Sequence, residues 1–153
     1  MRADRTCRLS RPMIPLTLGF LLVVGALFIA NERSEPEVLT GQASVIDGDT
    51  LRVAGQKVRL QGLAAPEMDE PGGIEAKNAM IQLVDRQQVS CELDGTTSYD
   101  RVVGICYVAG RDVAELLVTR GLARDCPRFS GGRYRELETP AARRLPLPGY
   151  CSL

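Results

Sequence analysis

The chain has 153 residues, with 19 basic and 19 acidic side chains and no histidine. This length suits one domain with additional segments. The lack of histidine excludes histidine-based nucleophilic catalysis, histidine-ligated zinc and histidine general bases. Residues 1–33 hold five Arg with Asp4 and Glu32, so residues 34–153 carry 14 basic and 17 acidic side chains. Their net charge of −3 lacks the strongly basic character of a protein that coats nucleic acid.

An uncharged apolar segment, Met13–Ala30, lies near the N-terminus. As a helix it would be about 27 Å long, close to the ~30 Å hydrocarbon thickness of a membrane. Arginines precede it, and Glu32, Glu35 and Glu37 follow it, so the N-terminus is expected inside the cell. We expect a single-pass anchor in the cell membrane through residues 13–30, with the domain on the extracytoplasmic (periplasmic) side. A cleaved signal, and hence a secreted protein, is the alternative.

The chain divides into residues 1–33 with the anchor, a linker at 34–38, a domain at 39–130 and a C-terminal extension at 131–153. Five apolar-alternating runs in the domain are predicted strands. They are Leu39–Asp47, Thr50–Ala54, Lys57–Leu60, Gln88–Leu93 and Val102–Val108. Gly55-Gln56 predicts a two-residue type II′ hairpin turn between the second and third runs. Residues 94–98 are the predicted connection between the last two.

Two helices are predicted from apolar positions at spacings of three and four. The first is Ile74–Arg86, which would cover an open end of the sheet, and the second is Asp112–Arg120. A third helix is predicted to start within Gly131–Glu138, with Pro140 ending it. This order of elements indicates a small β-barrel or another α+β fold.

Four cysteines follow the predicted anchor: Cys91, Cys106, Cys126 and Cys151. An even number in an oxidising compartment predicts two disulfides, for which three pairings exist. Cys91 and Cys106 lie in strands predicted to be neighbours and can meet, which leaves Cys126 with Cys151. The second bond would tie down the extension. Four buried thiols are the alternative, and a zinc site is disfavoured because no C-x-x-C motif occurs.

Four short motifs carry the polar residues of interest: Ile-Asp-Gly-Asp-Thr at 46–50, Val-Arg-Leu at 58–60, Ala-Pro-Glu at 65–67 and Tyr-Asp-Arg at 99–101. A hairpin over the first two can bring Asp49, Arg59 and Glu67 into one neighbourhood. Carboxylates that hold a hard cation or orient water, together with a guanidinium that binds phosphate, suit phosphodiester chemistry.

In order and spacing, these motifs resemble the thermonuclease family, the staphylococcal-nuclease-like OB-fold domains, from about Ala43 to Phe129. The resemblance implies an α+β fold, namely a five-stranded OB-fold β-barrel with two to three helices, here preceded by the transmembrane or signal segment. It also implies a monomeric, calcium-dependent nuclease that hydrolyses phosphodiester bonds of DNA or RNA.

The resemblance assigns roles to single residues. Asp49 and the backbone carbonyl of Ala65 would hold Ca²⁺, and Glu67 would serve the attacking water. Arg59 and Arg101 would bind the phosphate and stabilise the charge that develops on it.

Two aromatic residues, Tyr99 and Phe129, would contact the nucleotide in such a protein, whereas Pro127 stands where another aromatic residue is expected. The sequence departs from the family pattern at two further positions. Ala64 occupies the place of a second calcium carboxylate, which should weaken calcium binding severely. Asp100 replaces a glycine between Tyr99 and Arg101, and its charge either blunts the arginine or points to solvent.

Two functions therefore compete. Retention of Asp49, Arg59, Glu67 and Arg101 favours an extracytoplasmic nuclease. Ala64, Asp100 and the net charge of −3 favour a catalytically impaired, membrane-anchored OB-fold module that binds protein, glycan or nucleic acid.

Overall fold

Residues 35–152 are described by the structure, which is a computed structural model. The expected membrane segment at residues 13–30 lies outside the described residues. Within 35–152, no helix is long and apolar enough to cross a membrane. Pro36–Leu153 forms one compact unit, and the fold below is that of its described residues.

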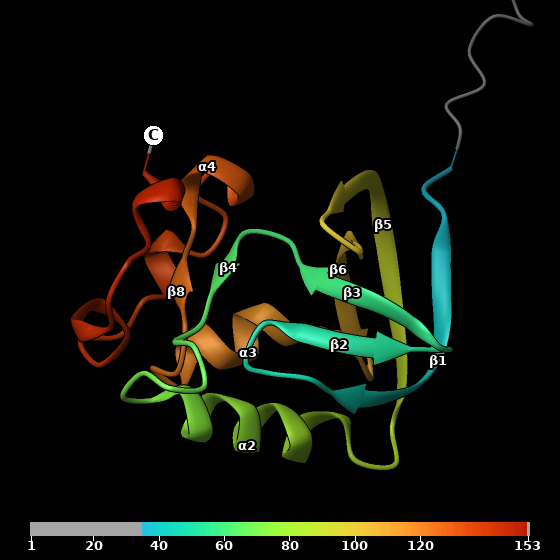
Figure 1. Cartoon of the computed structure of the whole chain (residues 1–153), viewed down its shortest axis with the longest axis horizontal. Coiled ribbons are helices and arrows are strands. Elements are labelled where there is room, and N and C mark those ends of the chain that lie inside the picture. Colours follow the sequence, from blue (N-terminus) through green and yellow to red (C-terminus); the bar gives the residue numbers. More distant parts are fainter. Residues whose placement is uncertain (1–34, 153) are drawn as a thin grey trace, which may run out of the picture. The chain divides into compact units, whose positions relative to one another are not determined.

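Five strands form a closed, OB-like barrel in the order β3-β2-β1-β5-β6, and short β7 extends the sheet beyond β6 (Figure 1). Neighbouring strands are antiparallel except β3 and β6, which run parallel and close the barrel. The OB-like α+β fold expected from the sequence is confirmed. The strands are β1 (Val38–Val45), β2 (Thr50–Val53), β3 (Gln56–Leu60), β4 (Leu63–Ala64), β5 (Gln88–Ser98), β6 (Arg101–Val108), β7 (Arg111–Asp112) and β8 (Arg124–Asp125).

The turn between β2 and β3 differs from the predicted one. Val53 pairs with Gln56, so the turn residues are Ala54 and Gly55 rather than Gly55 and Gln56. Both have positive φ, 46° and 86°, as a type I′ turn requires. The prediction of a type II′ turn was wrong because the ladder continues one residue closer to the turn on the β3 side.

The connection between β5 and β6 is also shorter than predicted. Thr97 pairs with Val102 and Ser98 with Arg101, so β5 runs past the predicted loop at 94–98. An irregularity between Leu93 and Thr97 absorbs the extra residues. Arg101 therefore begins β6 immediately after a tight turn.

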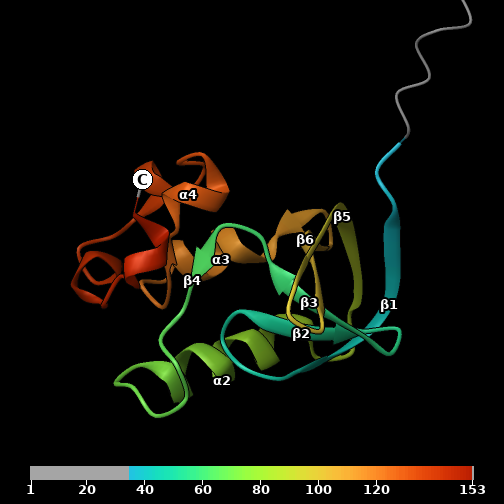
Figure 2. The ribbon, with the colours of Figure 1, turned by 45° about the horizontal axis from the view of Figure 1, so that its top comes forward.

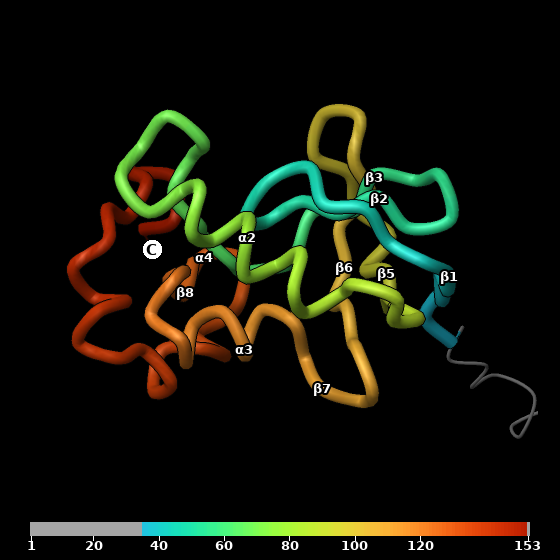
Figure 3. The backbone as a smooth tube through the Cα atoms, turned by 90° about the horizontal axis from the view of Figure 1, so that it is seen from below, coloured from blue at the N-terminus to red at the C-terminus, as the bar shows by residue number. Residues whose placement is uncertain are grey.

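Three α-helices are present among residues 35–152: α2 (Gly73–Val84), α3 (Val113–Thr119) and α4 (Pro127–Ser130). In Figures 1 and 3, α2 runs along one end of the barrel, beside α3. The side chain of Asp112 caps α3 by accepting from the N–H of Ala114 at 2.9 Å. The helix predicted within 131–138 was misplaced. Gly131 and Gly132 have positive φ, and α4 ends before them. Within 131–138 the only helical element is a 3₁₀ turn, Arg135–Leu137.

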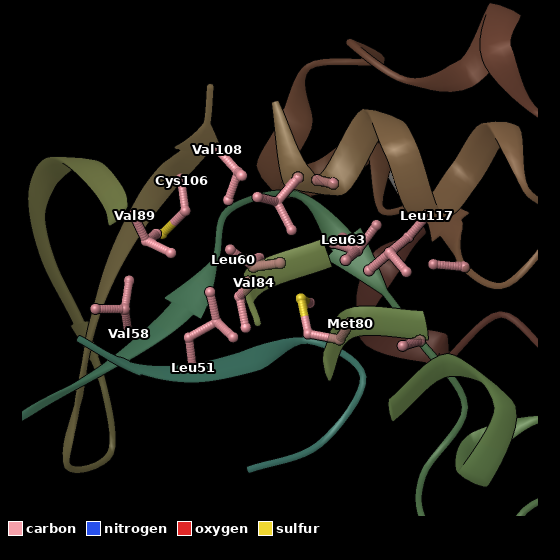
Figure 4. Packing of buried hydrophobic residues seen from close by; sticks show 14 of the residues in the cluster. Leu51, Val58, Leu60, Leu63, Met80, Val84, Val89, Cys106, Val108 and Leu117 are labelled. Carbon is pink, nitrogen blue, oxygen red and sulfur yellow. The ribbon is translucent and has the colours of Figure 1, made fainter. Parts of the chain in front are cut away.

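Apolar side chains from the strands meet those of α2 and α3 in one core (Figure 4). Leu51, Val58 and Leu60 point inward from β2 and β3, and Met80 of α2 and Leu117 of α3 cover them. All five are at most 1% exposed. The alternation of β2 and β3 that buries these residues turns their polar neighbours to the opposite face.

Two disulfides are present, Cys91–Cys106 and Cys126–Cys151, as expected for an oxidising compartment. The first joins paired residues of β5 and β6. The second joins the start of α4 to the last 3₁₀ turn, η3 (Gly149–Cys151). It holds the extension beside β4, at the α4 end of the molecule (Figure 2).

Candidate active site

The loop between β1 and β2 carries Asp49 and is fixed by its own backbone. The N–H of Asp49 donates to Oδ1 of Asp47 at 3.0 Å, and the carbonyl of Asp49 accepts from the N–H of Leu60 at 2.9 Å. Gly48 is packed so closely that an added Cβ would lie 2.7 Å from the Cβ of Ala65 and 2.9 Å from that of Ala76. Asp49 is therefore held between β3 and the loop before α2.

Asp49 and Arg59 form a buried ion pair through Oδ2 and Nη1. Their side chains are only 7% and 15% exposed. The register of β2 and β3 explains this contact, because Thr50 lies directly opposite Arg59. The Nη2 of Arg59 also donates to the carbonyl of Leu63 at 3.3 Å.

Burial raises the pKa of Asp49 to about 6, although the neighbouring Arg59 acts in the opposite direction. Asp47, a second nearby carboxylate, raises the pKa further. For Arg59, burial lowers the pKa, but the charge and the hydrogen bond of Asp49, with smaller effects of Tyr150 and Asp47, together outweigh it and the pKa is raised. Arg59 thus stays charged, and Asp49 is a carboxylate that burial makes costly to ionise.

Arg101 joins the same polar network through Thr50. Its Nη1 donates to the Thr50 hydroxyl at 3.2 Å, and that hydroxyl donates to Oδ1 of Asp49 at 2.8 Å. Ser98 holds the other side of the guanidinium, because its carbonyl and hydroxyl accept from Nε and Nη2 at 3.3 and 3.2 Å. No role was predicted for Thr50 or Ser98, although Thr50 belongs to the motif at 46–50.

Asp100 does not blunt Arg101 by contact. Its carboxylate forms an ion pair with Lys57 of β3 at 2.5 Å. A hydrogen bond from Lys57 lowers the pKa of Asp100. Tyr99 is 96% exposed, and the guanidinium of Arg101 lies 5.9 Å from the centre of its ring.

A cavity of about 270 Å³ opens beside Arg101. It is lined by Ile46, Asp47, Thr50, Lys57, Tyr99, Asp100 and Arg101. Two cationic side chains (Lys57 and Arg101), two carboxylates (Asp47 and Asp100, the latter paired with Lys57) and one exposed aromatic ring therefore border a space next to the polar network. A phosphate group and an attached sugar or base are ligands of matching chemistry.

Glu67 lies in the exposed loop before α2 and forms no hydrogen bond or ion pair with Asp49 or Arg59. Its N–H donates to the side chain of Glu70 at 2.9 Å, and the N–H of Gly73 donates to the carbonyl of Glu70 at 3.1 Å. Within residues 35–152 the carboxylate of Glu67 has no hydrogen bond or ion pair. Of the three residues expected to meet, the structure brings Asp49 and Arg59 together.

The position of the expected second calcium carboxylate is covered by the extension. Ala64 is 3% exposed and packs with Cys126, Cys151 and Leu147. In the described range 35–152, no cluster of three or more Asp, Glu, Cys or His residues could hold a metal. Ca²⁺ takes six to eight oxygen ligands. Since Asp49 is engaged by Arg59, these residues do not fit a calcium ion.

Phe129 lies in α4 and is 52% exposed. Its ring is 6.5 Å from that of Tyr150 at an angle of 56°, and the guanidinium of Arg128 lies 5.7 Å from its centre. Tyr150 was not predicted as a site residue. The one feature of the sequence that could have pointed to it is its position next to Cys151.

With this geometry in view, the protein belongs to the staphylococcal nuclease homologue family, whose model matches residues 57–142. The match contains Arg59, Glu67 and Arg101, whereas Asp49 and Tyr150 lie outside it. Members of this family are typically calcium-dependent.

Curated proteins similar to this chain include one named for succinoglycan biosynthesis and two named staphylococcal-like nucleases. "Succinoglycan biosynthesis protein ExoI" of Rhizobium meliloti (strain 1021) is 35% identical over 152 residues, covering 92% of this chain and 78% of that protein. The "Probable staphylococcal-like nuclease CAN1" of Oryza sativa subsp. japonica is 32% identical over 76 residues, covering 50% of this chain and 23% of that protein. The "Staphylococcal-like nuclease CAN1" of Arabidopsis thaliana is 31% identical over 67 residues, covering 44% and 21%. The chain thus spans less than a quarter of either plant protein.

Proposed function

We propose that this protein is a nuclease that hydrolyses phosphodiester bonds of DNA or RNA outside the cytoplasm. The observation that carries the proposal is the polar network that joins Arg59, Asp49, Thr50 and Arg101 beside an open cavity. Two arginines fixed from different sides suit a phosphate whose charge increases during the attack of water.

In this proposal the arginines perform the electrostatic work. A phosphate oxygen competes with Asp49 for the guanidinium of Arg59, and Arg101 binds a second oxygen from the cavity side. Glu67 has an exposed carboxylate that is free to orient the attacking water. In this proposal, the exposed loop that carries Glu67 brings its carboxylate to the phosphate bound on Arg59.

Calcium dependence would follow from the family, but the residues around Asp49 do not fit the ion. No step of the proposed mechanism therefore uses a metal ion. The assay below includes calcium because a substrate phosphate adds oxygen ligands that the protein lacks.

An extracytoplasmic location is supported by the two disulfides, which persist in oxidising compartments. The apolar segment at 13–30 supports a membrane anchor that leaves the barrel on that side. Binding without catalysis is the second candidate, favoured by the extension that covers Ala64 and by the lack, among residues 35–152, of any hydrogen bond or ion pair between Glu67 and the network.

The test is hydrolysis of single-stranded DNA and RNA by the full chain, purified in detergent with its disulfides intact. We compare calcium with a chelator, and Glu67→Gln with Glu136→Gln, an exposed glutamate away from the network. Cleavage that is lost only in Glu67→Gln supports the nuclease. A folded protein that binds these substrates but cleaves neither, with or without calcium, refutes it in favour of the binding module.

A further inference from the structure

We propose that Tyr150 is a substrate-binding residue of this protein, on whose exposed ring a nucleobase of the substrate stacks beside Phe129. The inference rests on the proposed function, because it assigns the part of the substrate that lies next to the phosphate. Tyr150 lies outside the residues that match the family model, 57–142.

The first reason is the exposure of the aromatic pair. Phe129 is 52% and Tyr150 49% exposed, whereas Tyr134, a tyrosine in the same extension as Tyr150, is 2% exposed. Because the two rings are tilted by 56°, neither covers the face of the other. Bases stack on such exposed rings without needing a particular sequence.

The second reason is the position of the pair beside the polar network. The N–H of Cys126 donates to the carbonyl of Gly62 at 2.8 Å, and Ser130 packs directly against Gly62. These contacts hold α4, and with it Phe129, next to the short strand that follows Arg59.

Tyr150 is held to the same strand from the other side. Cys151 packs against Ala64, one residue after the carbonyl that accepts from Arg59. The Tyr150 hydroxyl lies close enough to influence Arg59. Burial lowers the pKa of Arg59, whereas Asp49 and, more weakly, Tyr150 raise it. If a phosphate of the substrate binds Arg59, the nucleoside attached to that phosphate can therefore reach the rings of Phe129 and Tyr150.

The third reason is that the platform is rigid. The Cys126–Cys151 bond fixes the residue after Tyr150, and the N–H of Cys151 donates to the carbonyl of Pro148 at 2.9 Å. A ring that is already ordered loses little conformational entropy when a base stacks on it. Arg128, beside Phe129, adds a cation for an adjacent phosphate.

The chain contains no tryptophan, so Tyr150→Trp in the full chain creates a single fluorescent reporter. The probe is a short nuclease-resistant phosphorothioate oligothymidylate, and the control probe is an abasic strand of the same length. Tyr107→Trp is the matched control variant, because Tyr107 borders a different cavity. We expect the base-bearing strand to quench only the Tyr150→Trp variant, and the abasic strand to quench neither.

Binding measured by anisotropy of a labelled strand separates stacking from packing. Loss of one base–aromatic contact should weaken binding about 5- to 150-fold in Tyr150→Ala. Tyr150→Phe should bind like the wild type, whereas Tyr150→Leu, which keeps the bulk without the aromatic ring, should resemble Tyr150→Ala. Unchanged melting temperatures show that the extension stays in place.

The outcomes separate the two proposals. Cleavage and binding that persist in Tyr150→Ala, without quenching of Tyr150→Trp, overturn the role of Tyr150 and leave the nuclease standing. Base-dependent quenching without any cleavage by the wild type supports the stacking site and refutes the nuclease. Equal quenching by the abasic strand overturns the role of Tyr150, since stacking needs a base.

Discussion

Replacing Ala64 with aspartate restores the carboxylate that the family pattern places there, and the structure predicts that the restoration destabilises the protein. The side chain at this position is buried against Cys126, Cys151 and Leu147. Full burial raises the pKa of a carboxyl group by about 3–5 units. The introduced carboxyl would therefore be protonated in the folded protein at pH 7. Relative to an unfolded pKa of about 3.9, this costs about 4 kcal/mol, a large share of a domain's stability.

The sign of the pH dependence follows from this shift. The folded pKa is raised, so the folded state binds the extra proton more tightly than the unfolded state does. The part of the destabilisation that comes from this pKa shift is absent below about pH 4 and grows as the pH rises to 7. Urea unfolding at pH 4.5 and 7, with Ala64→Asn as the uncharged control of similar size, measures the difference directly.

The competing possibility is that the introduced carboxyl reaches Asp49 and completes a calcium site. Calcium would then stabilise the variant by an amount that rises with the logarithm of its concentration. If Ala64→Asp unfolds within 1 kcal/mol of Ala64→Asn at pH 7, and calcium stabilises only the aspartate variant, our interpretation of the covered strand is wrong.

Three further predictions concern stability. Replacing both Cys126 and Cys151 with serine should cost about 3.5 kcal/mol of unfolding free energy, because the bond spans 25 residues. In metal-free buffer, the raised pKa of Asp49, about 6 against 3.8, favours the protonated form in the folded state. Stability should fall by about 3 kcal/mol as the pH rises from about 3 to 7, most steeply between the two pKa values, and then level off. Gly48→Ala should cost about 1–3 kcal/mol, because its Cβ would collide with those of Ala65 and Ala76.

Urea unfolding with the matching variants checks each of these. Serine at both Cys91 and Cys106 is the comparison for the first, with about 3 kcal/mol expected for a separation of 15 residues. Asp49→Asn should remove the pH dependence in the second, and a slope that survives would assign it to another group. A Gly48→Ala protein as stable as the wild type would mean that the loop has room to move.

Local patterns carried much of what could be predicted about this protein. Asp49 and Arg59 are ten positions apart in one hairpin, so the motif and the hairpin together predict their contact. Alternating burial predicted the strands, and spacings of three and four predicted α2 and α3. The turn at Ala54 and Gly55 was missed because a short apolar run does not specify the last pair of its ladder.

What the sequence could not provide depends on contacts between distant segments. Asp100 was left with two possible roles because its partner, Lys57, lies in a strand that pairs with β6 only when the barrel closes. The burial of Ala64 and the exposure of Tyr150 both follow from where the extension packs. No local pattern reports the packing of a segment that lies more than 80 residues from the strand it covers.

The seam between β3 and β6 links folding to activity. Its three parallel pairs, Val58 with Val102, Arg59 with Val103 and Leu60 with Gly104, join segments more than 40 residues apart. Such non-local pairings are slow to form, and they set the order in which a chain acquires its contacts. Because Arg59 and Arg101 stand on opposite sides of this seam, the network that links them through Asp49 and Thr50 is complete only in the closed barrel. A local opening of the β3–β6 pairing, detectable as hydrogen exchange of its amides, would separate the two arginines and abolish activity while the rest of the fold persists.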